Sequence, residues 1–397
     1  MIFNTGWFLV FFVAAYAVLN LLPGRQLRFY ALLILSAVFH WHFAGPAGVA
    51  PIVAMALMVY LIALRLSAAT GAARRRWLGL GLAVPVAGLV FYKYRVFVVE
   101  NLALAWPSLP QRLGPWSQAP FLPLAISFFT FEFVHYLVDV YHGGQPLRRP
   151  SVFALFCIYF PSIASGPIKR YQDFNAQVDG GLERPWKSSL KWEGLAQVIT
   201  GYFKKIVVAD NAAVLAGLLE ARTELGRGPV LMLMLMLSIR ILFDFSGYSD
   251  MAIGFSKLLG LRLPANFNFP YWATNPSDFW RRWHMSLSSW IRDYIYIPLG
   301  GSRQGAARRV ANGIVAMVIC GLWHGPAWHF ALWGLFHGAG LALHGAYRQW
   351  RPAQGTPAAW RTGLARLALF GFVSYGWLLF FYPLPRVLRM TATLLGL

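Results

Sequence analysis

The chain has 397 residues, of which 58% are hydrophobic and only 12% are charged, and its mean hydropathy is +0.52. Soluble globular proteins are closer to half apolar and a quarter charged, so this composition argues against an ordinary soluble domain. The formal net charge of +21 is also compatible with nucleic-acid binding. However, the basic residues form short clusters between apolar runs, as in cytoplasmic loops of membrane proteins. We therefore expect a polytopic membrane protein without a nucleic-acid partner.

Apolar segments of membrane-spanning length recur along the whole chain. Because a transmembrane helix needs about 20 apolar residues, we expect an all-α fold of about eight to eleven transmembrane helices with re-entrant and interfacial helices. The first segment has no basic stretch or small-residue cleavage site before it ends, which predicts a retained span and not a signal peptide. The segments are 5–22, 28–44, 48–66, 77–99, 121–141, 151–166, 193–219, 229–249, 310–324, 327–346 and 366–382.

The loops between the first spans alternate in charge. Arg25 and Arg28 lie in the first loop, the next loop at 44–50 carries no charge, and Arg74–Arg76 follow in the third. Since basic loops remain in the cytoplasm, the pattern predicts an extracytoplasmic N-terminus.

The alternation fails around residues 151–166. A full crossing there would place the basic stretch 167–191, including Lys169, outside the cell. We therefore expect 151–166 to enter the membrane from the cytoplasmic side and return, with Pro161 and Pro167 interrupting the helix.

The segment 275–297 is predicted to form one amphipathic helix that begins at an Asn275 N-cap. Arg281, His284, Ser288 and Arg292 would share its polar face, opposite a face of aromatic and aliphatic residues. Two interpretations remain open. The helix lies in the membrane interface with its polar face solvated, or that face lines a cavity for an anionic substrate.

His324 is the strongest single candidate for chemistry. It follows a stretch without charge from Ala311 to Trp323 and precedes Gly325-Pro326, where the helix should break. An ionisable residue at membrane depth is costly and indicates function. The alternative is a neutral imidazole that forms a structural hydrogen bond in the helix bundle. Weaker candidates of the same kind are His329, His337 and His344.

Two aspartates follow the apolar run 229–237. Gly247 lies between Asp244 and Asp250 and is expected to break the helix there. Buried carboxylates at this place would orient a histidine or pair with arginines. The alternative is an ion pair that only fixes helix packing.

Glu132, His135 and Asp139 lie at helical spacing on one face of a predicted span. They are compatible with a proton path, a metal site or a structural network. His40 and His42 supply only two ligands, which is weak support for a metal. The two cysteines, Cys157 and Cys320, lie in apolar runs and are expected to be inert. We expect no bound metal.

Several long stretches resemble the membrane-bound O-acyltransferase (MBOAT) family. They cover about residues 121–345, and YIPLGGSR at 296–303 favours the alginate O-acetyltransferase-like bacterial branch over the teichoic-acid D-alanylation branch. The stretches are SFFTFEFVHYLVDVYHG at 127–143, FPSIASGPIKRYQDF at 160–174, FDFSGYSDMAIGFSKLLGLRLPANFNFPY at 243–271, FWRRWHMSLSSWIRDYIYIPLGGSR at 279–303 and GLWHG at 321–325.

The resemblance implies an acyltransferase in a bacterial cytoplasmic membrane, with helices around a central tunnel. It implies one membrane-embedded domain over 1–397, in which 1–120 supplies N-terminal spans, 121–345 the catalytic core and 346–397 a C-terminal span.

The resemblance also assigns roles to residues. It implies that His324 is the general base and that His284 polarises the thioester carbonyl or shares the proton. Arg281, Arg282 and Arg292 would hold the phosphates of the donor. The other expected substrate-binding residues are Trp280, Trp323 and Ser288. Asp244 and Asp250 would contact and orient the residues that touch the substrate.

By this resemblance the donor is acetyl-CoA or an acyl carrier thioester, with no bound cofactor. The acceptor is a hydroxyl of an exported polysaccharide or of an extracytoplasmic SGNH-hydrolase-like partner. Three alternatives stay open: a D-alanyl transfer subunit, an acyl-relay subunit active only in a complex, and a proton-coupled transporter. Duplicated halves typical of a transporter are not evident in the sequence.

Overall fold

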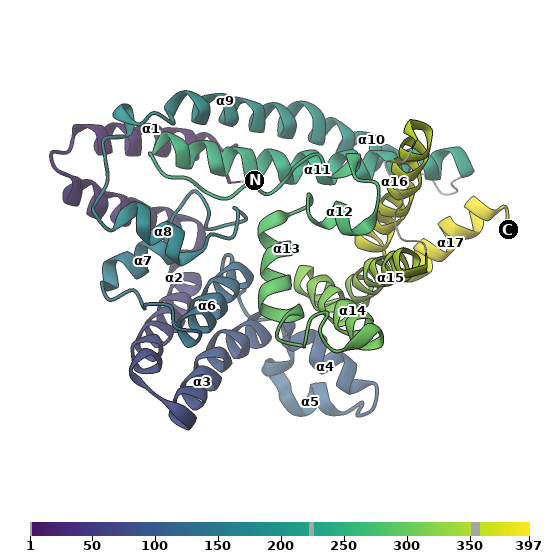
Figure 1. The fold of residues 1–397 in the computed structure, drawn as a ribbon, viewed down its shortest axis with the longest axis horizontal. Coiled ribbons are helices and arrows are strands. Elements are labelled where there is room, and N and C mark those ends of the chain that lie inside the picture. Colours follow the sequence, from purple (N-terminus) through teal and green to yellow (C-terminus); the bar gives the residue numbers. More distant parts are fainter. Residues whose placement is uncertain (1, 222–225, 351–357) are drawn as a thin grey trace. The chain divides into compact units, whose positions relative to one another are not determined.

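The computed structural model describes residues 2–221, 226–350 and 358–397, and no strand occurs among them (Figure 1). The predicted all-α fold class is therefore confirmed. The contacts divide the chain into two compact units, Met1–Ile199 with Asp250–Pro264, and Thr200–Ser249 with Ala265–Leu397. That the whole chain acts as one domain stays a prediction.

The first unit contains the N-terminal helices and the middle of the chain. Helices α2, α3 and α6 pack against one another, and α7 packs against α2 and α8. Its helices are α1 (Gly6–Leu21), α2 (Arg25–Ala68), α3 (Gly71–Leu89), η1 (Val90–Tyr94), α4 (Arg95–Ala103), α5 (Leu109–Leu113), η2 (Gly114–Ser117), α6 (Ile126–Tyr141), α7 (Pro150–Ile158), α8 (Tyr171–Val178), η3 (Pro185–Lys187) and most of α9 (Lys191–Tyr202).

Helix α2 is two helices joined at a kink. Its 44 residues would extend about 66 Å at 1.5 Å per residue, about twice the thickness of a bilayer core. Gly45 has φ 62° and ψ 175°, which no α-helix contains, and Pro46 follows it. Glycine tolerates this positive φ because it has no Cβ. The kink separates the segments predicted at 28–44 and 48–66.

Helix α7 is too short to cross a membrane. It has nine residues, about 13 Å at 1.5 Å per residue, and the chain from Tyr159 to Arg170 is irregular. This agrees with a segment that does not cross as one helix, and the side from which it enters stays a prediction. Lys169, expected among the cytoplasmic basic residues, is instead 2% exposed.

Lys169 is buried because it pairs with Glu132 of α6. The other two residues of the α6 stripe have different partners. His135 Nδ1 lies 3.2 Å from the Phe131 carbonyl oxygen, and Asp139 accepts a hydrogen bond from Gln172 at 2.7 Å. Separate partners favour the structural network among the three alternatives. No cluster of three or more potential metal ligands occurs within the described parts of the chain.

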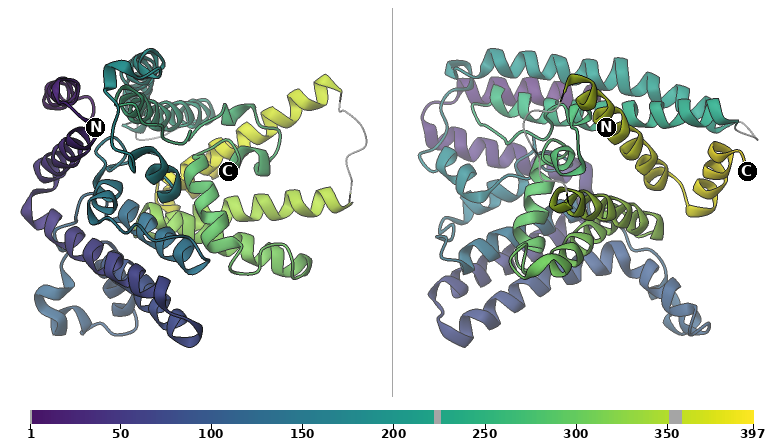
Figure 2. Two further views of the ribbon diagram at one scale, coloured as in Figure 1. Left: turned by 60° about the vertical axis from the view of Figure 1, so that its left-hand side comes forward. Right: turned by 45° about the vertical axis from the view of Figure 1, so that its right-hand side comes forward.

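The second unit contains the C-terminal half of the chain. Helices α14 and α15 form a closely packed antiparallel pair, and α16 packs on α15 (Figures 1 and 2). Its elements are η4 (Phe203–Ala209), α10 (Asp210–Glu220), most of α11 (Arg227–Leu258), η5 (Pro270–Trp272), α12 (Pro276–Trp280), α13 (Met285–Ile291), η6 (Arg292–Tyr296), α14 (Gly305–His324), α15 (Trp328–Trp350), α16 (Ala359–Phe381) and α17 (Leu384–Leu395).

The predicted helix break at Gly247 is wrong, because α11 continues through it to Leu258. Gly247 serves close packing instead. A Cβ there would come within 2.8 Å of the Gly201 carbonyl oxygen and 3.1 Å of the Lys204 Cβ. Glycine is required at this position by the approach of two helices, since any larger side chain overlaps the neighbouring backbone.

The single amphipathic helix predicted for 275–297 is also wrong. The structure has two short helices, α12 and α13, separated by a turn that ends at His284. The N-cap prediction holds, since the Asn275 side chain accepts a hydrogen bond from the Asp278 amide. The break removes the shared polar face, because Arg281 is exposed and His284 is 2% exposed.

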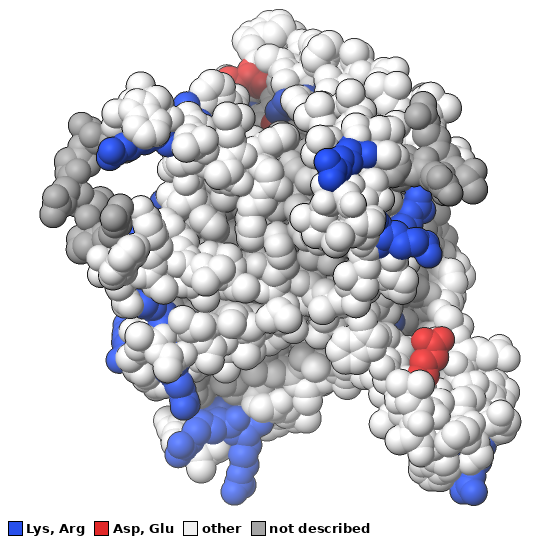
Figure 3. Space-filling model, turned by 90° about the vertical axis from the view of Figure 1, so that its right-hand side faces the viewer, with Lys and Arg blue, Asp and Glu red and all other residues white. Residues whose placement is uncertain are grey.

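Five stretches of helix are long and apolar enough to cross a membrane within the described ranges. They are Arg25–Ala68, Gly71–Ala103, Arg227–Leu258, Gly305–His324 and Ala359–Phe381. The face drawn in Figure 3 consists largely of uncharged residues, with Lys, Arg, Asp and Glu confined to a few groups. Exposed apolar side chains such as Val10, Ile34 and Leu57 suit contact with lipid. The number of crossings stays a prediction.

Candidate active site

His284 occupies an unusual backbone conformation at the turn between α12 and α13. Its φ of 41° and ψ of 55° are left-handed, which is uncommon for a residue with a Cβ. The segment around Asn266 holds the turn, because the Met285 amide donates to the Asn266 carbonyl oxygen at 2.8 Å. Strained residues of this kind occur often at functional sites.

The Asn266 side chain determines which nitrogen of His284 carries the proton. Asn266 Nδ2 donates to Ser249 Oγ at 3.0 Å, which directs Oδ1 toward the turn. Oδ1 lies 2.6 Å from Ser286 Oγ and 3.3 Å from His284 Nδ1. Because a carboxamide oxygen only accepts, Nδ1 of His284 donates. Nε2 then presents a lone pair, and it has no hydrogen-bond partner among the described residues.

The surroundings of His284 keep its imidazole neutral. Burial lowers the pKa of His284 well below its ordinary value of about 6.5, and the neighbouring His324 lowers it further. Phe245 contributes to this burial, with its ring centroid 4.6 Å from that of His284. A neutral imidazole with an unoccupied lone pair is able to accept a hydrogen bond from a hydroxyl or another donor.

Trp323 connects the two histidines. Its ring centroid lies 6.4 Å from that of His284 and 4.8 Å from that of His324. His284 and His324, which are 40 positions apart in the sequence, therefore both contact one tryptophan ring. Their catalytic roles stay predictions. His324, the last residue of α14, is half-buried, so packed side chains do not enclose it completely.

Further aromatic rings surround His324. Its ring centroid is 5.3 Å from that of Trp333 and 5.0 Å from that of Phe380. Trp333 in turn contacts His337 at 4.9 Å and Trp280 at 5.7 Å. We call Trp280, Trp333 and His337 the inner cluster. Trp280 was expected from the sequence, His337 was a weak candidate, and Trp333 was missed.

The inner cluster contains buried polar atoms that lack hydrogen-bond partners in the described structure. These are the indole nitrogens of Trp280 and Trp333 and both ring nitrogens of His337. The exposed fractions are 9% for Trp280 and 1% each for Trp333 and His337. Leaving a buried polar group unsatisfied costs about 1–3 kcal/mol, so such a cluster indicates a site for a polar occupant.

The three arginines expected to bind phosphate each pair with an aspartate. Arg281 and Arg282 both pair with Asp278, at 3.4 and 3.0 Å. The Nε atom of Arg292 donates to Asp293 at 2.8 Å. That these three arginines hold the phosphates of the donor stays a prediction.

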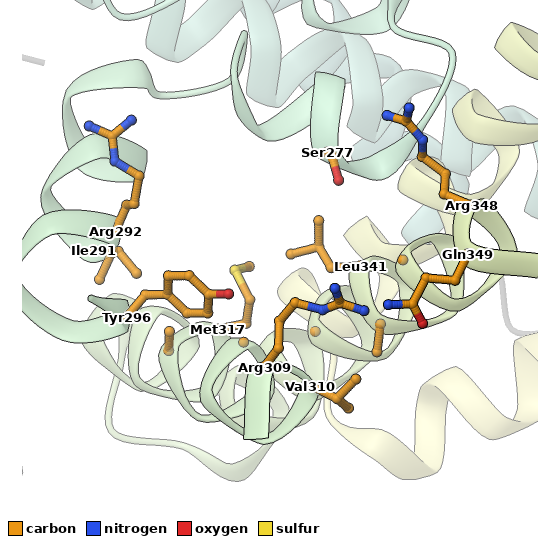
Figure 4. A pocket seen from close by; sticks show the side chains of 15 residues that line it. Ser277, Ile291, Arg292, Tyr296, Arg309, Val310, Met317, Leu341, Arg348 and Gln349 are labelled. Atoms are coloured by element: carbon orange, nitrogen blue, oxygen red, sulfur yellow. The ribbon is translucent and has the colours of Figure 1, made fainter. Parts of the chain in front are cut away.

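A cavity of about 490 Å³ lies between α12, α13, η6, α14 and α15 (Figure 4). One side is apolar, and two further arginines reach it from the ends of α14 and α15. Neither His284 nor His324 is among its described lining residues. These residues are Ser277, Ile291, Arg292, Tyr296, Arg309, Val310, Gly313, Ala316, Met317, Gly338, Leu341, Ala342, Gly345, Arg348 and Gln349. The predicted central tunnel stays a prediction.

Three remaining site predictions point to structural contacts. The hydroxyl of Ser288 donates to the Trp283 carbonyl oxygen at 2.9 Å, within its own turn. Asp244 and Asp210 both accept hydrogen bonds from Lys205 at 2.6 Å. Asp250, which belongs to the first unit, accepts one from Gln197 at 3.0 Å. Asp244 and Asp250, which lie on neighbouring turns of α11, thus bind different partners.

Several residues around the histidines were not predicted. Asn266 and Phe245 lie inside the stretch that resembles the family, but nothing in their spacing marks them as partners of His284. Trp333 and His337 are four residues apart on α15, so they share a helix face. That spacing was the one sequence signal that could have indicated a contact between Trp333 and His337. Arg309 was interpreted only as part of a basic loop, and Arg348 was not singled out.

The fold and this site define a multi-pass membrane protein with two histidines gathered beside a tryptophan. The sequence model of the MBOAT, membrane-bound O-acyltransferase family, matches residues 150–383. The chain belongs to this family and is an O-acyltransferase.

Individual relatives extend the match over nearly the whole chain. The chain is 36% identical over 391 residues to the probable alginate O-acetylase AlgI of Azotobacter vinelandii, covering 96% of this chain and 75% of that protein. It is 34% identical over 415 residues to the peptidoglycan O-acetyltransferase of Helicobacter pylori, covering 96% and 77%. It is 31% identical over 274 residues to the teichoic acid D-alanyltransferase of Bacillus subtilis, covering 65% and 68%.

Proposed function

We propose that this enzyme transfers an acetyl group from a cytoplasmic thioester to a hydroxyl of an exported polysaccharide, with His324 as the general base. The observation that carries the proposal is the convergence of His324 and His284 on the ring of Trp323. Both histidines come from stretches that resemble the family, and they lie 40 positions apart in the chain. A structural histidine would not need a second buried histidine beside it.

The reaction needs a base because a neutral hydroxyl attacks a thioester slowly. His324 removes the hydroxyl proton as the oxygen attacks the thioester carbonyl carbon. A C–O bond forms, the C–S bond breaks, and the proton passes from the imidazolium to the leaving thiolate. The products are an ester and a free thiol. The half-buried position of His324 supports this role, because the ring remains accessible to a substrate.

His284 has two possible roles in this scheme, and the geometry favours one. Polarising a carbonyl requires a hydrogen-bond donor, but the Nδ1 proton of His284 is directed to Asn266. The Nε2 lone pair has no partner among the described residues. This arrangement supports a share in accepting or holding the proton near His324.

The acceptor is inferred from relatives and from topology. The alginate and peptidoglycan O-acetylating relatives support a polysaccharide hydroxyl outside the cytoplasmic membrane, and an extracytoplasmic N-terminus follows from the loop charges. Acetyl transfer to an extracytoplasmic SGNH-hydrolase-like partner is the variant in which this chain acts as a relay. The teichoic acid D-alanyltransferase relative supports D-alanyl transfer as the second candidate.

The test uses inner membranes that contain the full chain and the products of neighbouring genes. His324→Ala is compared with His142→Ala, because His142 is exposed and its Nδ1 atom lies 2.9 Å from the Val138 carbonyl oxygen of its own helix turn. Labelled acetyl-CoA and labelled D-alanyl carrier are supplied separately. We expect acetyl transfer to polymer that His324→Ala abolishes and His142→Ala preserves. Transfer of D-alanine alone would favour the second candidate.

A further inference from the structure

We propose that a groove between α1, η3, the beginning of α9 and the end of α11 binds an anionic phospholipid of the cytoplasmic leaflet. One acyl chain lies in the groove, and Lys191 binds the phosphate of the headgroup. All the described residues of this site belong to the first unit. The proposal does not depend on the acyl transfer proposed above.

The groove has a volume of about 160 Å³ and a wall that is almost entirely apolar. Figure 1 shows α1, α9 and α11 side by side at this place. Lining residues one helical turn apart come from α1 and again from α9, so each helix contributes one continuous face. Such a wall suits an extended hydrocarbon chain. The lining residues are Phe12 and Tyr16 of α1, Trp186 of η3, Lys191, Trp192 and Leu195 of α9, and Leu258 of α11.

Lys191 is the one cation among the described lining residues. Its Nζ atom donates to the Trp186 carbonyl oxygen at 2.7 Å. The same atom lies 4.4 Å from the ring centroid of Trp186 and 5.9 Å from that of Trp192. No carboxylate of the described chain pairs with Lys191. An ammonium group has three donors, so two of them are available to phosphate oxygens.

The carboxylates nearest to this lysine in the sequence are already neutralised by other cations. Glu183 pairs with Arg25. Glu193 Oε2 lies 3.4 Å from Lys257 Nζ. Lys187 is exposed and adds a further positive charge nearby. The mouth of the groove therefore keeps a positive charge, which attracts an anionic headgroup.

Two exposed tryptophans indicate that the mouth lies at a lipid–water interface. Trp186 is 59% exposed and Trp192 is 65% exposed. Tryptophans are enriched at the level of the lipid headgroups, where one end of the ring contacts hydrocarbon and the N–H meets water. The loop charges place the end of α1 and the basic stretch 184–191 on the cytoplasmic side. The bound lipid therefore belongs to the cytoplasmic leaflet.

Hydrogen bonds hold the two sides of the groove together. The Trp186 amide donates to Asn20 Oδ1 at 2.8 Å. Asn20 Nδ2 in turn donates to the Tyr16 carbonyl oxygen at 2.8 Å. The side chain of Asn20 thus fixes η3 against the last turns of α1. Because the groove is formed in advance, a lipid binds it with little rearrangement of the protein.

The size and charge of the groove distinguish an anionic phospholipid from other occupants. A stable protein interface takes about 20–30 residues from each partner, whereas seven described residues line this groove. A free phosphate would contact Lys191 and leave the apolar wall uncovered. A zwitterionic phospholipid would cover the wall, but the basic residues would repel its positive group. An anionic phospholipid satisfies both parts of the site.

Binding is measured by photolabelling of the full chain in phosphatidylcholine nanodiscs. Trace phosphatidylglycerol or phosphatidylcholine carries a photoreactive group in its acyl chain, and mass spectrometry identifies the labelled residues. Lys191→Gln removes the charge, Lys191→Arg keeps it, and Leu195→Trp fills the groove. Lys187→Gln is the matched control, because Lys187 is exposed and is not among the described lining residues. Thermal unfolding verifies that each variant is folded.

We expect phosphatidylglycerol to label the groove more than phosphatidylcholine does. Lys191→Gln should reduce the phosphatidylglycerol label about fivefold, and Lys187→Gln should change it by less than about twofold. Lys191→Arg should restore most of the label. Leu195→Trp should reduce the label from both lipids, because the indole takes the place of the acyl chain.

Equal labelling of the groove by both lipids would overturn the proposal, because it indicates general contact with the bilayer. An equal loss of label in Lys191→Gln and Lys187→Gln would overturn it for the same reason. Cross-links between two copies of the chain at Trp192, without lipid label, would assign the groove to a second copy and would also contradict a lipid site.

Discussion

The side-chain oxygen of Asn266 lies 3.3 Å from Nδ1 of His284 and accepts its proton in a hydrogen bond. This contact fixes the tautomer of an imidazole that is 2% exposed and directs its lone pair away from Asn266. A histidine in the wrong tautomer cannot accept a proton at the required nitrogen. The Asn266–His284 pair therefore links the strained turn to the proposed proton transfer.

Replacing Asn266 by Ala should lower acetyl transfer about tenfold to hundredfold, because His284 would lose its fixed tautomer and orientation. Asn211→Ala is the matched control, since Asn211 is exposed and its side-chain amide donates to the Val207 carbonyl oxygen of its own helix. It should lower transfer much less. The measurement is the initial rate of labelled acetyl transfer, normalised to the amount of enzyme in the membrane. Equal rates for the two variants would contradict the assigned role of Asn266.

The buried neutral His284 should make stability depend on pH. Its pKa is lowered in the folded state, so the unfolded chain binds more protons below about pH 6.5. Stability is therefore complete above that pH and falls as the pH drops from about 6.5 toward the folded pKa. The slope contributed by one histidine is at most about 1.4 kcal/mol per pH unit.

The measurement of this pH effect is denaturant unfolding of purified protein between pH 7.5 and 5. His284→Asn should reduce the pH dependence, because asparagine tolerates left-handed backbone and does not titrate there. His142→Asn should leave it unchanged. Parallel pH curves for the wild type and His284→Asn would show that His284 does not titrate between the two states as described.

The buried pair of Lys169 and Glu132 should be costly to break. Removing one partner from a buried ion pair typically costs about 3–5 kcal/mol, because the other charge stays buried without compensation. Glu132→Gln and Lys169→Met should each reduce the amount of folded protein, while the double variant should recover part of it. Unfolding free energies of the four proteins give the coupling. Additive losses would mean that the two charges do not stabilise each other.

Gly247→Ala should destabilise the second unit by about 1–3 kcal/mol, because the new methyl group would overlap the Gly201 carbonyl oxygen. Gly371→Ala is the control on α16, where a Cβ meets nothing within 4 Å. The control should be neutral or slightly stabilising, since alanine favours helix. Thermal unfolding distinguishes the two, and similar effects would show that helix propensity alone decides the outcome.

Much of the fold followed from hydropathy, because most apolar segments coincide with helices of the structure. The kink at Gly45 falls between two predicted segments, and α7 is as short as the charge pattern required. The failures have local causes. Gly247 was read as a helix break, but the close approach of Gly201 is a tertiary contact that spacing does not reveal. Lys169 was read as a loop charge, but its partner Glu132 is remote in the chain.

The site was predicted in part. His324, His284 and Trp323 do meet, as the resemblance implied, but the polar face with Arg281 and Arg292 does not exist. Helical periodicity cannot indicate that the backbone reverses to a left-handed conformation at His284, because contacts from Asn266 hold it there. Arg309 and Arg348 become neighbours of one cavity only through the pairing of α14 and α15. Nothing local marks either arginine.

The most direct test of the account is acetyl transfer by His324→Gln, which keeps the size and polarity of the side chain but removes the base. Membranes carrying equal amounts of wild-type or variant enzyme receive labelled acetyl-CoA or acetyl carrier, and label in the polymer is counted. The account predicts a loss of about 10²- to 10⁴-fold, with donor binding unchanged. Transfer within about twofold of the wild type would contradict His324 as the general base.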